Sequence, residues 1–195
     1  MQVTLLRDVG DALACRYWPL YDEAFAALRT ASPCRQFLTE DEFMEEMADP
    51  RILKFVLWDD GEAVGMALVA EDLSAVPWIS ADYFAARFPL EYAEGRLFYF
   101  GALLTAPHAR RNGNAKRLLA ALSEHVATVD GIAAFDCAGV NVPYVPDLVA
   151  AIADEVTDLD TERIDAQHYY AYRTSGLKAG RRFARTGQEA EPAPA

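Results

Sequence analysis

Apolar residues recur along the first part of the chain in periods that predict two helices and a β-hairpin. From Asp11 to about Arg29 they recur at intervals of three and four, the period of a helix. Thr39 and Glu42 have the spacing of a capping box, so we expect a second helix to begin at Thr39. Two apolar runs, 52–58 and 63–70, flank the turn signal DDGE and together predict a β-hairpin.

The remaining elements include two long apolar runs separated by a helix. The connection 73–95 contains a short helix over 81–87, which Ser80 is expected to cap. Near-continuous apolar runs are typical of strands that are buried on both faces. The predicted elements are a strand over 96–105, a helix over 115–128, a strand over 132–140, a helix over 146–156 and a last strand over 161–172.

The order of these elements predicts an α/β (α+β) fold. A strand–helix–strand unit between residues 96 and 140 implies a parallel pair with a right-handed crossover. The early hairpin implies antiparallel neighbours. We therefore expect a mixed, mostly antiparallel central sheet with one parallel strand pair and helices on both faces.

Composition limits the classes of partner. The 195 residues include 18 basic and 30 acidic side chains, a net charge of −12, so nucleic acid is not an expected partner. Three scattered cysteines without CxxC spacing argue against a disulfide framework and a zinc site, and we expect no metal. No stretch approaches 18 consecutive apolar residues, so we expect no membrane span and a cytoplasmic protein.

The chain length suits a single domain, which we place at residues 1–176. Residues 177–195 are rich in Pro, Ala and Glu and poor in apolar side chains, so we expect them to form a disordered tail. Basic residues at the start of this tail could contact an anionic partner. The interpretation we favour is a solvated tail that offsets an acidic body.

The loop after the strand over 96–105 is the most informative segment. It reads Arg110-Arg111-Asn112-Gly113-Asn114-Ala115 and leads directly into a helix. The small residues at 113 and 115 let a ligand approach the backbone, and the free N–H groups of a helix start bind anions. Lys116 and Arg117 add to the positive charge. The segment therefore predicts a phosphate site.

The same six residues carry a family resemblance. They contain neither the P-loop pattern nor the glycine pattern of dinucleotide-binding loops, but they match [Q/R]-x-x-G-x-[G/A] in full. The chain resembles the GNAT superfamily of N-acetyltransferases from about residue 16 to about residue 172. The resemblance implies a GNAT-like sheet whose parallel strands splay apart. It also implies an acyl-CoA, most simply acetyl-CoA, as co-substrate, and direct attack of an amine on its thioester.

The resemblance also implies roles for individual positions. The loop amides from 111 to 115 would bind the pyrophosphate, the end of the preceding strand would pair with the pantetheine arm, and Gly101 would mark the bulge that opens the sheet. An Asn after the second parallel strand also contacts the cofactor in the family. The implied cofactor-binding residues are Leu103, Leu104, Thr105, Arg110, Arg111, Asn112, Gly113, Asn114, Ala115 and Asn141.

The chemistry departs from the family pattern. The Tyr that usually acts as general acid, about eight residues beyond the Asn, is absent, because Leu148 to Ile152 occupy that stretch. Tyr144 is the first candidate to replace it and Tyr169 the second. Glu71 and Asp136 are candidate bases. The alternative is a solvated strand end for Glu71 and a structural hydrogen bond for Asp136.

The acceptor and the alternatives remain open. Trp78 and Tyr83, in the aromatic connection 73–95, are expected to line an acceptor pocket, or else a satellite core under a long loop. We expect an N-acyltransferase that acts on the amine of a small molecule or peptide, and a homodimer is left open. The alternatives are an acyl-CoA-binding module with weak or no catalysis, which the missing Tyr motivates, and an interaction protein that uses the basic tail.

Overall fold

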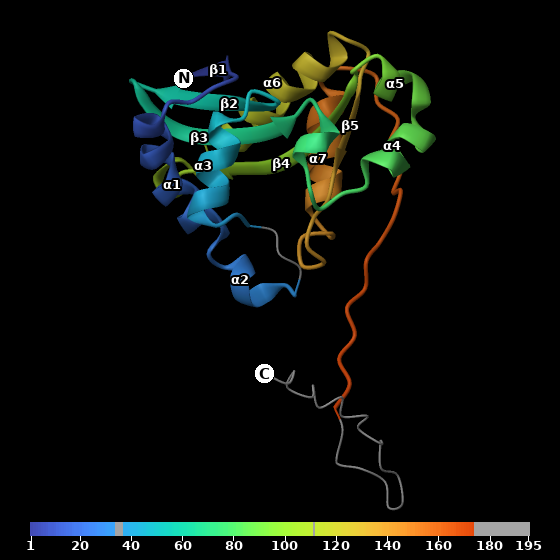
Figure 1. Ribbon diagram of the computed structural model, residues 1–195. Coiled ribbons are helices and arrows are strands. Elements are labelled where there is room, and N and C mark those ends of the chain that lie inside the picture. The colour runs from blue at the N-terminus through green and yellow to red at the C-terminus, as the bar shows by residue number, and fades with distance from the viewer. Residues whose placement is uncertain (34–36, 111, 174–195) are drawn as a thin grey trace, which may run out of the picture. The chain divides into compact units, whose positions relative to one another are not determined.

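A mixed β-sheet forms the centre of the protein (Figure 1). The computed structural model describes residues 1–33, 37–110 and 112–173, and within these residues the sheet has five strands in the order β1-β2-β3-β4-β5. The first three pairings are antiparallel and β4–β5 is parallel, which confirms the predicted mixed, mostly antiparallel sheet with one parallel pair. The strands are β1 (Gln2–Leu6), β2 (Ile52–Asp59), β3 (Glu62–Ala70), β4 (Leu97–Thr105) and β5 (Ile132–Phe135).

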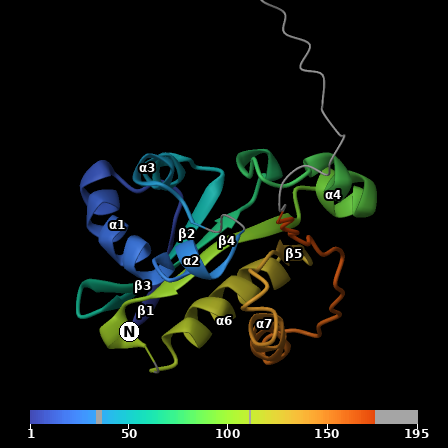
Figure 2. The ribbon, with the colours of Figure 1, turned by 90° about the horizontal axis from the view of Figure 1, so that it is seen from below.

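Helices cover both faces of this sheet (Figure 2). Alternating side chains on β2 enter two separate cores: Ile52 and Val56 pack under α1 and α3, whereas Leu53 and Phe55 pack under α6. The helices are α1 (Asp11–Phe25), α2 (Leu28–Ala31), α3 (Glu40–Ala48), α4 (Ala81–Arg87), α5 (Pro89–Ala93), α6 (Asn114–Ala127) and α7 (Val145–Asp154), with short 3-10 turns η1 (Leu73–Ala75) and η2 (Pro107–Ala109).

Local signals fix several of these elements where the sequence predicts them. Thr39 and Glu42 form the capping box at the start of α3, in which the Thr39 amide donates to Glu42 Oε2 at 2.8 Å. The turn between β2 and β3 has positive φ at Asp60 and Gly61, 46° and 82°, as a tight hairpin turn requires. Ser80 caps α4.

Strands β4 and β5 separate after four paired residues. Their register runs from Leu97 opposite Ile132 to Phe100 opposite Phe135 and then stops. On the other side of β4 the register shifts, because Leu68 lies opposite Ala102 and Val69 opposite Phe100. Gly101 is therefore the extra residue of a β-bulge, which confirms its predicted position.

Other sequence predictions of secondary structure are wrong. Residues 158–173 form neither helix nor strand and are exposed, so the predicted strand over 161–172, with Tyr169 on it, is absent. A strand needs a neighbour to satisfy its backbone, and β5 is only four residues long. The strand predicted over 132–140 ends at Phe135, and the first helix ends at Phe25 rather than near Arg29. Sequence reasoning missed β1 and α5, and the predicted tail over 177–195 lies outside the described residues.

Candidate functional site

The free edge of β4 is the first component of the candidate site. From Leu103 to Thr105 the strand pairs with β3, opposite Ala67, Met66 and Gly65. No described strand pairs with the other edge of β4 beyond Phe100. Backbone N–H and C=O groups alternate between the two edges of a strand, so this edge offers hydrogen bonds to an extended ligand, as an added strand would. The predicted contact residues Leu103, Leu104 and Thr105 all lie on this segment.

The start of α6 is the second component. Gly113 is the N-cap residue with φ of 72°, and no described side chain caps the helix. The first backbone N–H groups of a helix have no acceptor inside it, so they face the loop unsatisfied, and the helix dipole favours an anion there. A Cβ built on Gly113 meets nothing within 4 Å, so the protein leaves space at this position. The site therefore fits a phosphate group.

Side chains around this loop differ in what they offer. Arg110 and Asn112 are exposed, Ala115 is half-buried and Arg111 lies outside the described residues. Asn114 is buried; its Nδ2 donates to Ala109 O at 3.1 Å, and its Oδ1 has no described partner. This leaves one acceptor open at the helix start. Residues 110–115 together form the predicted phosphate loop.

The positive charge of the loop is smaller than the sequence suggests. The Lys116 Nζ lies 2.6 Å from Glu155 Oε2, at the end of α7, so this ammonium is already paired with a carboxylate. Arg110 and Arg117 are exposed and free to face a ligand in solution. Backbone amides, more than side-chain charge, are therefore what this loop offers to an anion.

The two predicted carboxylate bases both have partners. Glu71 follows β3, and Arg7 binds both of its oxygens, with Nη2 at 2.9 Å from Oε2. Asp136 follows β5 and accepts a hydrogen bond from the Tyr99 hydroxyl of β4. Burial and this bond raise the pKa of Tyr99 far above its usual range. Both interactions are structural contacts. For Asp136, a structural hydrogen bond is the predicted alternative to a catalytic role.

The predicted cofactor Asn and acid lie together before α7. Asn141 O accepts the backbone N–H of Tyr144 at 3.0 Å and that of Val145 at 2.9 Å, so a tight turn leads into the helix. The Tyr144 side chain is 72% exposed and so is accessible to a ligand. Among the described residues, neither side chain has a hydrogen bond or ion pair that assigns it a structural role.

The predicted acceptor-pocket residues lie on the connection between β3 and β4. Trp78 is half exposed and lines a small cavity together with Tyr99. Tyr83 is 43% exposed and packs edge-to-face on Phe84. Trp78 thus lies beside the opening between β4 and β5, whereas Tyr83 belongs to α4 and contacts its neighbour on that helix.

Sequence reasoning missed Glu46 of α3. It lines a small cavity with Trp78, Tyr99 and Gly101, directly beside the bulge of β4. Burial raises the pKa of its carboxyl to about 7. The available signal is the helical period, because Glu46 lies between Phe43 and Met47, both of them buried, on the apolar side of α3.

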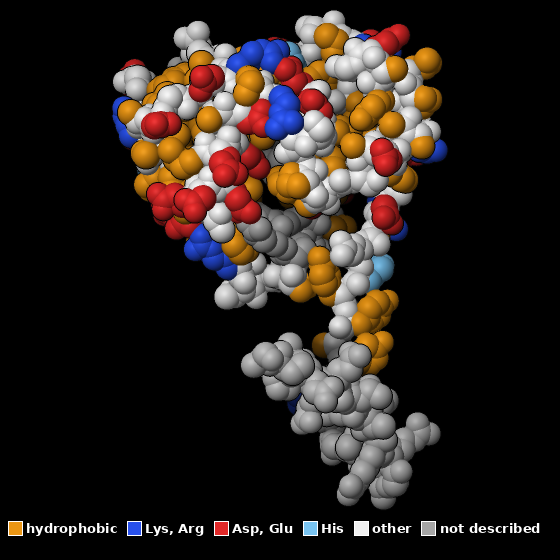
Figure 3. All heavy atoms as spheres, viewed as in Figure 1, with side chains coloured by type: hydrophobic (Ala, Val, Ile, Leu, Met, Phe, Trp, Pro, Cys, Tyr) orange, Lys and Arg blue, Asp and Glu red, His pale blue; other side chains and the backbone are white. Residues whose placement is uncertain are grey.

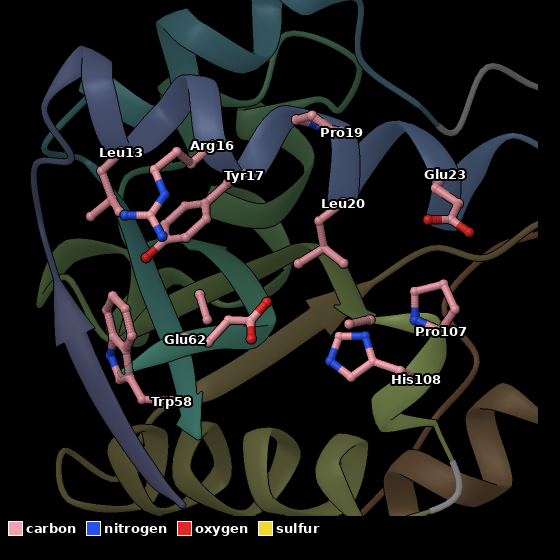
Figure 4. Close-up of a pocket in the computed structure, with 12 residues that line it drawn as sticks. Leu13, Arg16, Tyr17, Pro19, Leu20, Glu23, Trp58, Glu62, Pro107 and His108 are labelled. Atoms are coloured by element: carbon pink, nitrogen blue, oxygen red, sulfur yellow. The ribbon is translucent and has the colours of Figure 1, made fainter. Parts of the chain in front are cut away.

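A larger cleft of about 370 Å³ lies between α1 and the tip of the β2–β3 hairpin (Figure 4). Figure 4 shows Arg16 and Tyr17 of α1 facing Trp58 and Glu62 of the hairpin, with Pro107 and His108 at the far end. The Tyr17 hydroxyl is buried without a described partner, and burial raises its pKa to about 12. The cleft borders the residues that lead into the phosphate loop, on the α1 face of the sheet.

In the described parts of the chain, no group of three or more His, Cys, Asp or Glu side chains is arranged to hold a metal ion. No described helix is long and apolar enough to cross a membrane.

Comparison with known families identifies the class of protein. The model of the acetyltransferase (GNAT) family matches residues 16–143, which include both splayed strands and the phosphate loop. The chain therefore belongs to the GNAT family of acetyltransferases. Members of this class are N-acetyltransferases, and acetyl-CoA is their co-substrate. A search of curated protein sequences finds no match.

Solved structures share the fold at low sequence identity. An aminoglycoside acetyltransferase, meta-AAC0020 from an uncultured soil metagenomic sample, in complex with sisomicin, is 14% identical over 88% of this chain and 96% of that chain, with a TM-score of 0.50. The ribosomal-protein-S18-alanine N-acetyltransferase of Escherichia coli is 13% identical over 79% of this chain and 76% of that chain, also with a TM-score of 0.50. At these identities the likeness concerns the fold alone.

Proposed function

We propose that this protein transfers the acetyl group of acetyl-CoA to the amine of a small molecule or peptide, by direct attack on the thioester. The observation that carries the proposal is the free edge of β4 leading straight to the uncapped start of α6. An extended polar arm and a pyrophosphate are the two parts of acetyl-CoA that these features fit. When bound, acetyl-CoA supplies an activated acyl carbon, and the residues of this chain align it and transfer the protons.

We assign the binding roles to the predicted residues. The backbone of Leu103, Leu104 and Thr105 would align the pantetheine arm, and the amides from Asn112 to Ala115 would hold the pyrophosphate. Asn141 would contact the arm from the far side of the opening. Arg110, which is exposed beside the loop, would add charge without displacing an existing partner.

We assign the proton of the leaving sulfur to Tyr144. Its hydroxyl is accessible, and it follows Asn141 directly at the turn before α7. A thiol has a pKa of about 8.5, so the sulfur leaves as a thiolate with modest help, and an acid at this position accelerates the step without being essential.

A cationic small molecule is the acceptor class we favour. Acidic side chains gather over α3, the helix whose Glu46 lines the cavity beside the bulge of β4 (Figure 3). Glu40 and Asp41 are exposed there, in a chain with a net charge of −12, so the surface attracts polyamines and aminosugars more than acidic peptides. Sisomicin, found in the complex of the soil acetyltransferase, is an acceptor of this kind.

Calorimetric titration and a thiol-release assay test the proposal. We expect acetyl-CoA to bind the purified protein, and thiol to be released with sisomicin faster than with an alanine-initiated peptide. Binding without release for any amine in a broader panel would support the alternative of an acyl-CoA-binding module. Absence of acetyl-CoA binding would refute the proposal itself.

A further inference from the structure

The reactive end of the co-substrate has a defined place along β4. If the pyrophosphate lies at the start of α6, the arm runs back along the free edge from Thr105 towards Gly101. Four residues of strand span about 13 Å. The free edge ends at Gly101, where β5 resumes its pairing at Phe100, so the thioester would lie beside the bulge.

A small cavity on the α1–α3 face of the sheet lies at the same position. Glu46 of α3 lines it together with Trp78, Tyr99 and Gly101, and apolar side chains of β2, β3 and η1 complete the wall. Its volume of about 10 Å³ is close to the minimum that holds one water molecule. One water molecule in this cavity would therefore connect the Glu46 carboxylate to a group that reacts beside the bulge.

The other titratable groups around this cavity are engaged in hydrogen bonds, so Glu46 is the group that would accept a proton there. Of the described residues that line it, Tyr99 is the other one that titrates, and its hydroxyl already donates to Asp136. From β2, the buried Lys54 lies near Glu46, but its Nζ donates to Arg7 O at 2.9 Å and Asp49 O at 2.6 Å. From η1, the carboxylate of Asp72 accepts the Ser74 amide.

The charge environment suits a base that works at neutral pH. Burial raises the pKa of Glu46 to about 7, with smaller raising contributions from Glu42 and Asp49 and a lowering one from Lys54. A base with a pKa near the working pH has enough of its carboxylate form to accept a proton and enough basicity to hold it.

We propose that Glu46 is the catalytic base of this protein, accepting a proton from the acceptor's ammonium group directly or through one water. The inference rests on the proposed function. One N–H bond breaks and the proton goes to the carboxylate; the freed lone pair forms the C–N bond to the acyl carbon, and the C–S bond breaks with its electron pair on sulfur. Tyr144 gives its hydroxyl proton to the sulfur, the remaining excess proton on nitrogen restores that hydroxyl by way of solvent, and Glu46 returns its own proton to solvent.

A paired substitution separates this role from acetyl-CoA binding. Glu46→Gln keeps the shape of the side chain and removes its basicity, and Glu45→Gln removes an exposed charge from the same helix. We expect both variants to bind acetyl-CoA as the wild type does in calorimetry. We expect Glu46→Gln alone to lower kcat with sisomicin by about 100-fold, the usual scale for a general base. Its kcat/KM profile should also lose the rise through pH 7 that Glu45→Gln retains.

A readout without turnover keeps the inference testable if no acceptor is found. Carbon-13 NMR of labelled glutamate carboxyls, with the Glu46 signal assigned by its loss in Glu46→Gln, should show Glu46 titrating near pH 7 in the protein without ligand. The Glu46 signal should also move when acetyl-CoA is added. Titration of Glu46 at its ordinary value of about 4.5, an unmoved signal, or equal kcat in the two variants at every pH would overturn the assignment. Loss of acetyl-CoA binding by the wild type would instead refute the proposed function.

Discussion

The Tyr99 hydroxyl on β4 donates a hydrogen bond to Oδ1 of Asp136, the residue that directly follows β5. The bond joins the two parallel strands at the point where their backbone pairing stops. It therefore holds the mouth of the opening at a set width, next to the stacked rings of Phe100 and Phe135.

Tyr99→Phe should lower the free energy of unfolding by about 1 kcal/mol, because the Asp136 carboxylate loses the hydroxyl that donates to it and is solvated by water instead. For a domain of this size that is a Tm decrease of about 2–4 °C. Tyr83→Phe is the control, since the Tyr83 side chain is 43% exposed. Equal melting of the two variants would show that the bond contributes nothing to stability.

Gly113→Glu should abolish acetyl-CoA binding in calorimetry while the protein stays folded. The side chain would bring a carboxylate into the space where the phosphate is expected, at a backbone φ of 72°. Gly61→Glu is a matched control, because its φ of 82° imposes the same strain in open space at the β2–β3 turn. A folded Gly113→Glu protein with wild-type affinity would remove the phosphate loop from the site.

Glu46→Gln should stabilise the protein, and by more as the pH rises. The folded-state pKa of Glu46, about 7, lies above the ordinary 4.5, so the native state holds this proton more tightly than the unfolded state does. The wild type therefore loses stability between about pH 4.5 and 7, and Gln does not. We expect an advantage of about 2 kcal/mol at pH 8, less than the full shift implies because the side chain is partly exposed. Thermal melts at pH 4 and 8 measure it, and a pH-independent difference would contradict it.

Gly131→Ala should cost about 1–3 kcal/mol of stability. Its Cβ would lie 2.8 Å from the backbone oxygen of Arg96, the same oxygen that accepts the Ile132 amide at the start of β5. Backbone has to shift to relieve that contact. Gly139→Ala, with nothing within 4 Å of the new Cβ, should melt like the wild type. Chemical denaturation of the pair decides whether this contact positions β5.

Tyr144→Phe should lower the rate of acetyl transfer about tenfold or more and leave acetyl-CoA affinity nearly unchanged. A general acid typically supplies about 100-fold or more, and the thiolate leaves partly unaided, so we expect a modest share of that factor. Tyr92→Phe, an exposed tyrosine on α5, is the control. If both variants turn over at the wild-type rate, Tyr144 does not protonate the sulfur.

The sequence by itself determined the features that depend on neighbours along the chain. The capping box of Thr39 and Glu42, the DDG turn and the Gly113 loop each act within a few residues, and all three appear as predicted. The bulge at Gly101 was likewise accessible, because glycine in an apolar strand marks such a site.

The tertiary structure decided which groups meet across the sheet. Glu46 lines the same cavity as Gly101 because α3 packs against β2, and the charge of Lys116 is paired because Glu155, at the end of α7, lies beside it. The same holds for Asp136, whose partner lies 37 positions earlier, and for the described residues 158–173, which form no strand because β5 ends after four residues. Local patterns set each element's conformation, whereas burial and pairing between distant elements set the protonation and contacts of the site.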